Sequence, residues 1–465
     1  IREVFGLSAE PKAPVGFDWK PGKPISQMTD LFPCGTYLSN AHAVRCLQRR
    51  RAKVAAGSCN SLPPLITDFD EAQRNTILEQ ILPQEAYSGE RVDLWNIMLK
   101  YPQVFVPPTA TNRCVNRDEP WDWQWKRSSD GTPHIGTWDD RRKKAPAQQA
   151  LIHEFIMEEL KKGNIEEEPH PSRHVSPSLL VPKKDDARWC LAPTEMNKYL
   201  SPESCIFPDM FQELQSLSNN STRKFVLDEP DCFKKILLSE NSQRFALFRD
   251  PLTKKVYRWK RMFFGSTNAP AACNKYARKF LDALPDHVRE RSLQYVDDLL
   301  VVEKRSDPIP RDRGSNTLLQ LLDHILRVAD NHTIKYSLEK FRFGLREPVF
   351  FGWIVGQGSI SYSDKKLIKL RDLPAPRCKK ELQGFLGMTN ALRAMIPNYT
   401  EKTSSLRPLT GKVPWPEKGL SEIQLQAIED IKVALETSAR LYSPDYTLPL
   451  YVETDSSQHA CGAML

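Results

Sequence analysis

Residues 293–301 read Leu-Gln-Tyr-Val-Asp-Asp-Leu-Leu-Val. Two adjacent carboxylates separate two short apolar segments, and this pattern is typical of a β-hairpin with a tight turn at Asp297-Asp298. Asp is common in such turns because it tolerates unusual φ values, so a plain polar hairpin tip is one interpretation. The other is a cation site, because neighbouring carboxylates repel each other and Mg²⁺ prefers oxygen ligands.

A pair of Mg²⁺ ions that promotes phosphoryl transfer needs a further carboxylate on a neighbouring strand. Residues 225–228, Phe-Val-Leu-Asp, supply one at the end of an apolar segment, and Phe233 follows five residues later. Either motif alone is a weak signal, because both consist of common residues. The two motifs in this order, with these flanking residues, are much more specific.

Together these two segments resemble a reverse transcriptase. Tyr-x-Asp-Asp is the second metal motif of that family, and a strand that ends in Leu-Asp before an aromatic residue is its first. The resemblance covers about residues 130–465 and is closest to gypsy-type LTR retrotransposon Pol polyproteins. It implies an α+β right-hand polymerase, with fingers, palm and thumb, that acts as an RNA-directed DNA polymerase.

Composition agrees with an intracellular protein that binds a polyanion. Lys and Arg number 66 against 58 Asp and Glu, a net charge of +8. No apolar segment approaches the ~18–20 residues that a membrane span needs, so we expect no membrane partner. The ten Cys show no Cys-x-x-Cys spacing, which indicates free thiols in a reducing compartment. We expect a cytoplasmic retrotransposon particle, with the nucleus as an alternative location. Because the chain begins at Ile1, we also expect a fragment of a longer polypeptide.

The resemblance implies that Asp228, Asp297 and Asp298 are both the catalytic residues and the ligands of two Mg²⁺ ions, with Mn²⁺ as an alternative. One ion would lower the pKa of the primer 3′-hydroxyl and the other would neutralise the leaving pyrophosphate. The implied partners are an RNA or DNA template with its primer, and deoxynucleoside triphosphates. Both a monomer and a homodimer remain open.

Residues 176–191 resemble the fingers hairpin of the family, a strand that leads into a basic turn and a second strand. In the family a Lys and an Arg of this hairpin grip the triphosphate, and Lys183 and Arg188 occupy those positions. A cation on each strand suits a polyphosphate, since Arg offers a two-pronged donor. A solvated hairpin tip is the alternative.

Residues 262–271 resemble the segment that forms the floor of the nucleotide pocket and then begins a palm helix near Asn268. The resemblance assigns Phe264 and Gly265 to nucleotide binding. It places Phe233 under the sugar, where its ring would collide with a 2′-hydroxyl, and Tyr295 near the primer end.

Two further segments resemble parts that contact primer and template. Phe351, Gly352 and Trp353 match a Phe-x-Gly turn, although Trp stands where His is usual. Residues 364–447 are expected to be all-helical and to form the thumb. Basic residues are frequent at the start of this unit. They either follow the phosphate backbone of the nucleic acid or form a solvated surface, and we give the two interpretations equal weight. The candidates for phosphate contact are Lys366, Lys369 and Arg371.

We expect residues 1–130 to be a poorly patterned extension, 131–358 the fingers and palm, 359–447 a helical thumb or connection, and 448–465 the truncated start of a ribonuclease H-like domain. Asp455 occupies the position of the first metal ligand of that last fold. Because no further carboxylates follow, ribonuclease H activity is not expected. Three alternating Trp, 121, 123 and 125, suggest either a base-stacking platform or, as the more frequent case, burial.

Departures from the family pattern raise a second hypothesis. Residues 192–195 read Ala-Pro-Thr-Glu where Asp-Tyr-Arg is usual, and Glu229 and Pro230 follow the first metal motif. Pro230 lacks an N–H and is poorly suited to a central strand. A decayed or host-retained copy that binds nucleic acid without polymerising is therefore the alternative function.

Overall fold

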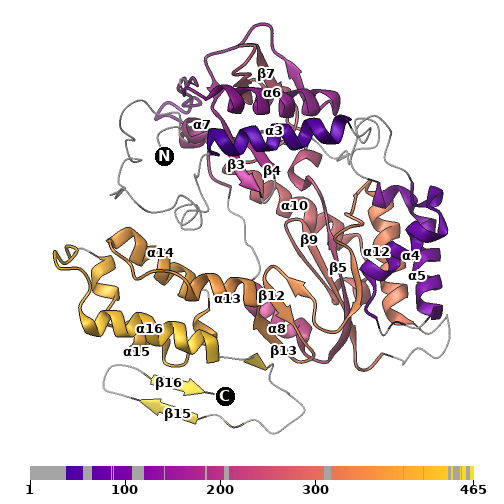
Figure 1. Cartoon of the computed structure of the whole chain (residues 1–465), viewed down its shortest axis with the longest axis vertical. Coiled ribbons are helices and arrows are strands. Elements are labelled where there is room, and N and C mark those ends of the chain that lie inside the picture. The colour runs from indigo at the N-terminus through magenta and orange to yellow at the C-terminus, as the bar shows by residue number, and fades with distance from the viewer. Residues whose placement is uncertain are drawn as a thin grey trace.

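The computed structural model describes residues 38–55, 65–84, 86, 88–106, 120–140, 142–183, 186–203, 209–307, 316–390, 392–411, 413–437, 441–442, 451, 453–456 and 461–464. Within these ranges, no helix combines the length and the apolar character that crossing a membrane requires. The described elements form fingers, palm and thumb regions, and the palm contains the central sheet. The fingers lie at the top of Figure 1 and the thumb at its lower left.

The central sheet, which we call the palm sheet, is antiparallel. Its strand order is β10 (Arg342–Leu345), β5 (Ser221–Asp228), β9 (Asp298–Lys304) and β8 (Ser292–Tyr295). The central strands β5 and β9 contain almost continuous apolar segments, which is expected for strands that are covered on both faces. Phe225, Leu299 and Val301 are all fully buried.

Helices cover the palm sheet on one side. Helix α12 (Thr317–Asn331) begins at Asn316, whose side chain accepts from the Leu319 N–H, and its leucines face the sheet. Two helices from the N-terminal part, α4 (Glu71–Ile81) and α5 (Ser88–Lys100), pack into the same core beside α12 (Figure 1). Part of the predicted N-terminal extension is therefore an integral part of the palm core.

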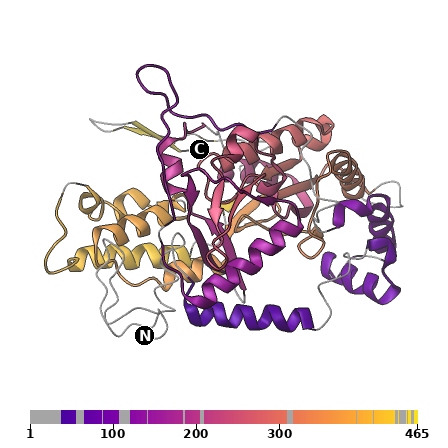
Figure 2. The same ribbon diagram turned by 90° about the horizontal axis from the view of Figure 1, so that it is seen from above.

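The fingers region combines two neighbouring helices with two small sheets. Helices α3 (Asn40–Ala55) and α6 (Pro146–Lys161) lie side by side, as Figure 2 shows. One sheet has the order β1 (Ile165–Glu167), β7 (Val256–Trp259), β6 (Leu247–Arg249) and β2 (Val175–Ser176). The other is the hairpin of β3 (Ser178–Lys183) and β4 (Asp186–Leu191), where the sequence predicted it.

The Trp residues that alternate before the fingers are core residues. Trp121 and Trp123 are 6% and 2% exposed, and Trp123 packs edge-on against Phe263 at 5.9 Å between ring centroids. Trp125 is partly buried against the same cluster. The structure therefore confirms the interpretation that these Trp residues are buried, and not the alternative that they form a base-stacking platform.

The thumb is helical, as predicted, with one exception at its end. It contains α13 (Asp364–Arg371), α14 (Lys379–Asn390), α15 (Tyr399–Lys402) and α16 (Glu422–Thr437). A sheet of order β11 (Val349–Phe350), β12 (Trp353–Val355), β13 (Ser359–Tyr362) and β14 (Leu441–Tyr442) connects it to the palm. The expectation of helix throughout 364–447 is therefore wrong at β14, because Leu441 pairs with Ile360 and extends this sheet.

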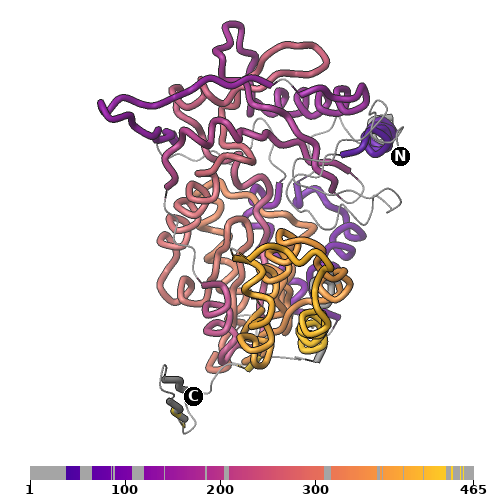
Figure 3. The backbone as a smooth tube through the Cα atoms, turned by 90° about the vertical axis from the view of Figure 1, so that its left-hand side faces the viewer, coloured from indigo at the N-terminus to yellow at the C-terminus, as the bar shows by residue number. Residues whose placement is uncertain are grey.

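At the C-terminal end, β15 (Glu453–Ser456) pairs with β16 (Cys461–Met464), and Asp455 lies opposite Gly462. This hairpin stands apart from the thumb and palm in Figure 3.

A cluster of charged side chains joins α5 to the palm sheet. The Arg223 guanidinium on β5 donates to Glu90 on α5 at 2.6 Å and to both carboxylate oxygens of Glu303 on β9 at 2.9 Å. Asn316, the cap of α12, donates to Glu90 at 3.0 Å. The side chains of Glu90 and Glu303 are only 5% and 7% exposed, so each depends on Arg223 for its counter-charge.

We predict that Arg223→Ala lowers the free energy of unfolding by about 3–5 kcal/mol, because it leaves two buried carboxylates without a cation. The matched control is Arg289→Ala, which removes a pair whose members are 42% and 80% exposed and should cost about 1 kcal/mol or less. Urea unfolding monitored by circular dichroism measures both values. Equal losses in the two variants would contradict the assigned role of Arg223.

Candidate active site

The two adjacent carboxylates lie at the β8–β9 hairpin, but the turn is displaced by one residue from the prediction. Tyr295 pairs with Asp298, so the two turn residues are Val296 and Asp297, and Asp298 is the first residue of β9. Val296 adopts φ +56°, a conformation that β-branched residues rarely take. The prediction of a turn at Asp297-Asp298 is therefore wrong, because Asp298 is needed in the ladder with β5.

The third carboxylate is on the neighbouring strand, as predicted. Asp228 ends β5 and is the direct register partner of Asp298. Directly opposed residues on antiparallel strands hold their Cβ atoms about 4.5–5.5 Å apart on the same face of the sheet. The predicted proximity of Asp228 to the Asp297-Asp298 pair is thus confirmed.

Backbone hydrogen bonds fix this end of the sheet. The Glu229 N–H donates to the Asp297 carbonyl at 2.7 Å, and the Ser337 N–H donates to the Asp228 carbonyl at 2.9 Å. These bonds hold the hairpin turn against the end of β5. The position of each carboxylate is therefore set by main-chain bonds as well as by its own strand.

Burial and neighbouring negative charge raise the pKa of Asp297 and of Asp298. Burial, followed by the charges of Asp297 and Asp228, raises the pKa of Asp298 to about 7. Burial and the nearby Asp228 also raise the pKa of Asp297. A proton or an added cation is therefore favoured at this site near neutral pH.

Lys340 is a site residue that the sequence did not reveal. Its ammonium lies 2.6 Å from Oδ1 of Asp228, although the Lys340 side chain is 63% exposed. Among the described residues, no group of three or more His, Cys, Asp or Glu side chains is already arranged around a metal position. The site fits a cation by its charge and its raised pKa values, and an ammonium takes that place beside Asp228.

Glu229 and Pro230 do not disturb the strand that carries Asp228. Strand β5 ends at Asp228, so Pro230 lies beyond the ladder and its missing N–H breaks no sheet bond. Glu229 is 2% exposed, and the Lys235 ammonium donates to both of its carboxylate oxygens at 2.8 Å. The doubt that Pro230 raised about this backbone is therefore removed.

On the fingers side, the structure brings the predicted nucleotide-binding residues together. The Arg188 guanidinium lies 5.2 Å from the centre of the Phe264 ring, and that ring packs edge-on against Phe233 at 5.0 Å. Lys183 and Arg188 are both exposed and belong to opposite strands of the β3–β4 hairpin. Arg188, Phe264 and Phe233 therefore form one chain of contacts, and Lys183 lies on the neighbouring strand of the same hairpin.

Gly265 lies in a position that only glycine tolerates. Its φ is +108°, and an added Cβ would approach the Leu191 carbonyl oxygen to 2.6 Å. The Asn197 amide donates to the Gly265 carbonyl at 2.9 Å and its oxygen accepts from the Thr267 N–H at 3.0 Å. Asn197 lies on α7 (Thr194–Tyr199), just after the segment that departs from the family pattern, and still fixes the loop of Gly265.

The predicted primer-side residues divide into two groups. Phe351 and Gly352, with φ +48° and +84°, form the turn between β11 and β12, and the Phe351 ring lies 4.4 Å from that of Tyr295. Trp353 instead is 6% exposed and packs against Phe211 in the core. The Trp353 side chain is therefore part of the core, and its role on the primer side stays a prediction.

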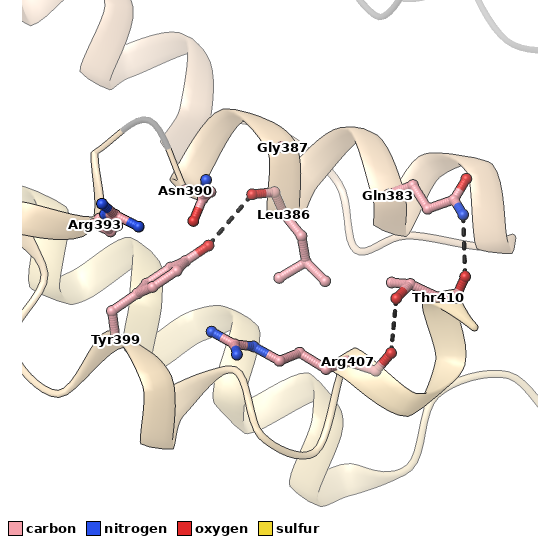
Figure 4. Close-up of a pocket in the computed structure, with 8 residues that line it drawn as sticks. All are labelled: Gln383, Leu386, Gly387, Asn390, Arg393, Tyr399, Arg407 and Thr410. Carbon is pink, nitrogen blue, oxygen red and sulfur yellow. Dashed lines mark hydrogen bonds between the residues drawn. The ribbon is translucent and has the colours of Figure 1, made fainter. Parts of the chain in front are cut away.

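The thumb carries further candidate contacts. Arg371 is exposed and pairs with Asp372 at 2.9 Å, whereas the side chains of Lys366 and Lys369 lie outside the described residues. A hollow of about 570 Å³ opens between α14 and the segment that follows it (Figure 4). Its lining consists of Gln383, Leu386, Gly387, Asn390, Arg393, Tyr399, Arg407 and Thr410.

Solved structures share this fold. A foamy viral protease-reverse transcriptase in complex with double-stranded DNA superimposes with a TM-score of 0.65 at 20% identity, over 87% of this chain and 67% of that one. The same protein in complex with an RNA/DNA hybrid gives a TM-score of 0.64 at 20% identity, over 85% and 50%. The predicted α+β right-hand fold is therefore confirmed.

Sequence relatives agree with the fold. The chain is 30% identical over 316 residues to the retrovirus-related Pol polyprotein from transposon opus of Drosophila melanogaster, which covers 64% of this chain and 30% of the relative. It is 26% identical over 323 residues to the Transposon Tf2-3 polyprotein of Schizosaccharomyces pombe, over 69% and 23%. The chain thus spans less than a third of the length of these relatives.

A family model described as "Reverse transcriptase (RNA-dependent DNA polymerase)" matches residues 188–389. This range contains Arg188, Phe233, Phe264 and all three aspartates. Residues 188–389 are therefore similar to a reverse transcriptase domain, and the chain is similar to retrotransposon Pol polyproteins.

Proposed function

We propose that this protein is an RNA-directed DNA polymerase, which adds deoxynucleotides to a primer 3′-hydroxyl. The observation that supports this most directly is the register of the palm sheet, which sets Asp228 opposite Asp298 and beside Asp297. Three neighbouring carboxylates, two of them with a raised pKa, suit divalent cations better than an uncharged ligand.

In this proposal Asp228, Asp297 and Asp298 hold Mg²⁺, and Mn²⁺ offers the same chemistry. The bound ions would activate the primer hydroxyl and neutralise the leaving pyrophosphate. The Lys340 ammonium, 2.6 Å from Oδ1 of Asp228, adds a positive charge to the site. This charge offsets part of the repulsion among the three carboxylates.

Lys183 and Arg188 would bind the triphosphate, since both are exposed cations on one hairpin. The Phe264 ring packs against the Arg188 guanidinium and contacts the ring of Phe233, which would face the sugar. Tyr295 and Phe351, with rings in contact, would support the primer end. The incoming nucleotide would then lie between the fingers hairpin and the carboxylates.

The proposed substrates are a primed RNA or DNA template and deoxynucleoside triphosphates. The solved relatives of this fold hold double-stranded DNA or an RNA/DNA hybrid, which supports a duplex partner here. A gypsy-type element as the source, and a cytoplasmic particle or the nucleus as the location, remain proposals from the sequence. Both a monomer and a homodimer remain open as the assembly.

A decayed copy that binds nucleic acid without polymerising is the second candidate. The irregular residues 192–195 favour it, because they replace the usual charged pair of the motif. The buried pair of Glu229 and Lys235 opposes it, since both charges are satisfied in the folded chain. Primer extension with Mg²⁺ on a poly(rA) template separates the two candidates.

We predict that Asp297→Asn abolishes primer extension, because the site loses a negative ligand charge, while folding and duplex binding stay near the parent level. The control is Asp282→Asn on the exposed end of α10 (Ala269–Asp282), which should extend primers normally. Extension assays and binding of a labelled primer–template give the two readouts. Normal extension by Asp297→Asn would refute the assignment.

The raised pKa of Asp298 predicts how stability depends on pH in EDTA. Between about pH 4 and pH 7 the native protein keeps a proton that the unfolded chain has lost, so stability falls as pH rises through this range. Asp298→Asn should remove this loss and raise the Tm at pH 8 by about 2–4 °C. Added Mg²⁺ should stabilise the parent at pH 8 more than at pH 5.

Differential scanning fluorimetry across pH 5 to 8, with EDTA or Mg²⁺, measures both effects. Asp282→Asn serves again as the control and should follow the parent at every pH. A parent with the same Tm at pH 5 and pH 8 in EDTA would contradict the prediction.

Substitution of Phe233 tests whether its ring selects deoxynucleotides over ribonucleotides. If its ring excludes a 2′-hydroxyl by overlap, Phe233→Val should incorporate ribonucleotides at least about tenfold better relative to deoxynucleotides. Incorporation of both nucleotide types by parent and variant on one template provides the measurement. An active parent with the same discrimination as Phe233→Val would show that Phe233 is a core residue only.

A further inference from the structure

Helix α3 packs directly on the hairpin that carries Lys183 and Arg188. The Leu38 N–H, just before α3, donates to the Leu180 carbonyl on β3 at 3.1 Å. Cys46 and Leu47 of α3 are buried in the same hydrophobic cluster as Leu180. Helix α3 lies outside residues 188–389, so the reverse transcriptase family match assigns it no role.

Arg50 makes the polar contacts of α3 with the fingers. Its Nε and NH2 donate to the two carboxylate oxygens of Asp186 at 3.2 and 3.0 Å. Its NH1 donates to Glu158 on α6 at 2.6 Å, and its guanidinium lies 3.9 Å from the centre of the Phe155 ring. One side chain, 19% exposed, therefore joins α3, α6 and β4.

Asp186 is the first residue of β4, and its direct register partner on β3 is Lys183. Arg188, two residues further along β4, is on the same face of the hairpin. Opposite charges that face each other across two strands attract, so an unpaired Asp186 would draw the Lys183 ammonium to itself. Within the described residues, however, no ion pair joins Lys183 and Asp186.

We propose that Arg50 is a positioning residue for nucleotide binding. It holds both carboxylate oxygens of Asp186 and thereby leaves the Lys183 ammonium free for the triphosphate. The proposal rests on the proposed polymerase function, because that function assigns the triphosphate to Lys183. Arg50, which lies far outside the residues that the family model matches, would thereby contribute to nucleotide binding.

Physical chemistry favours Arg50 over Lys183 as the partner of Asp186. A guanidinium that donates to both carboxylate oxygens has a fixed orientation, and the paired hydrogen bonds are stronger than a single hydrogen bond from an ammonium. Arg50 is also restrained by Glu158 and the Phe155 ring, so little further side-chain entropy is lost. Lys183 is exposed, so a pair between it and Asp186 would be weaker than the restrained two-pronged bond of Arg50.

Nucleotide affinity provides a test that does not depend on catalysis. A primer that ends in a dideoxynucleotide lets the next deoxynucleoside triphosphate bind without being added, and the stability of that complex against a competitor gives its Kd. We expect Arg50→Ala to raise this Kd about threefold to fivefold, the factor that a cross-strand charge pair contributes. The control, Arg51→Ala, removes a 74% exposed neighbour on α3 and should match the parent.

A double-mutant cycle separates this role from simple support of the fingers. Asp186→Asn removes the competing charge, so Arg50→Ala should have no further effect on Kd in an Asp186→Asn background. It should also have no effect in a Lys183→Ala background, because the captured cation is absent. An equal rise in Kd on adding Arg50→Ala in either background would overturn the proposal.

Arg50→Lys covers the case in which Arg50→Ala does not fold. It keeps the charge and the stem but loses the two-pronged bond, and we expect an intermediate Kd that Asp186→Asn restores to the parent value. An unchanged Kd in Arg50→Lys and Arg50→Ala would overturn the proposal. A parent that binds the nucleotide but does not extend an unblocked primer would refute polymerase activity alone, and the cycle would still decide the role of Arg50.

Discussion

The structure depends on holding three carboxylates against their mutual repulsion. The ladder between β5 and β9 sets Asp228 opposite Asp298, and the hairpin turn adds Asp297 beside them. Burial, together with this repulsion, raises the pKa of both Asp297 and Asp298. The surrounding fold must therefore supply rigidity from outside the site, through the buried strands, the Glu229 and Ser337 backbone bonds and the cation of Lys340.

Much of the architecture was predictable because it depends on local patterns. The apolar segments around the aspartates predicted both strands, and the local pair of Asp70 and Gln73 forms the capping box that begins α4. The turn position was wrong by one residue, because β9 must begin at Asp298 to pair with Asp228, and that pairing is not local. Trp353 was assigned to the primer side from its motif position, and its burial depends on packing that no short motif specifies.

The contacts that complete the site could not be predicted from the sequence, because they also join residues that are far apart in the chain. Lys340 meets Asp228 across 112 positions, and Arg50 meets Asp186 across 136. A lone Lys or Arg gives no signal of its partner, because surface cations are mostly solvated. Sequence motifs therefore identified the groups proposed for the chemistry, whereas the groups that balance their charge appeared only when the chain was folded.

The departures from the family pattern are best understood through this balance of charge. A single buried charge is strongly destabilising, so a chain that merely accumulates substitutions should leave such charges unpaired. Glu229 is 2% exposed and Lys235 is 6% exposed, yet the two meet in a two-pronged contact directly behind Asp228. The Asn197 amide likewise bonds both sides of the Gly265 loop after an irregular segment. The residues that depart from the family pattern next to the proposed site therefore have partners within the same fold, so among the described residues these departures leave no buried charge unpaired there.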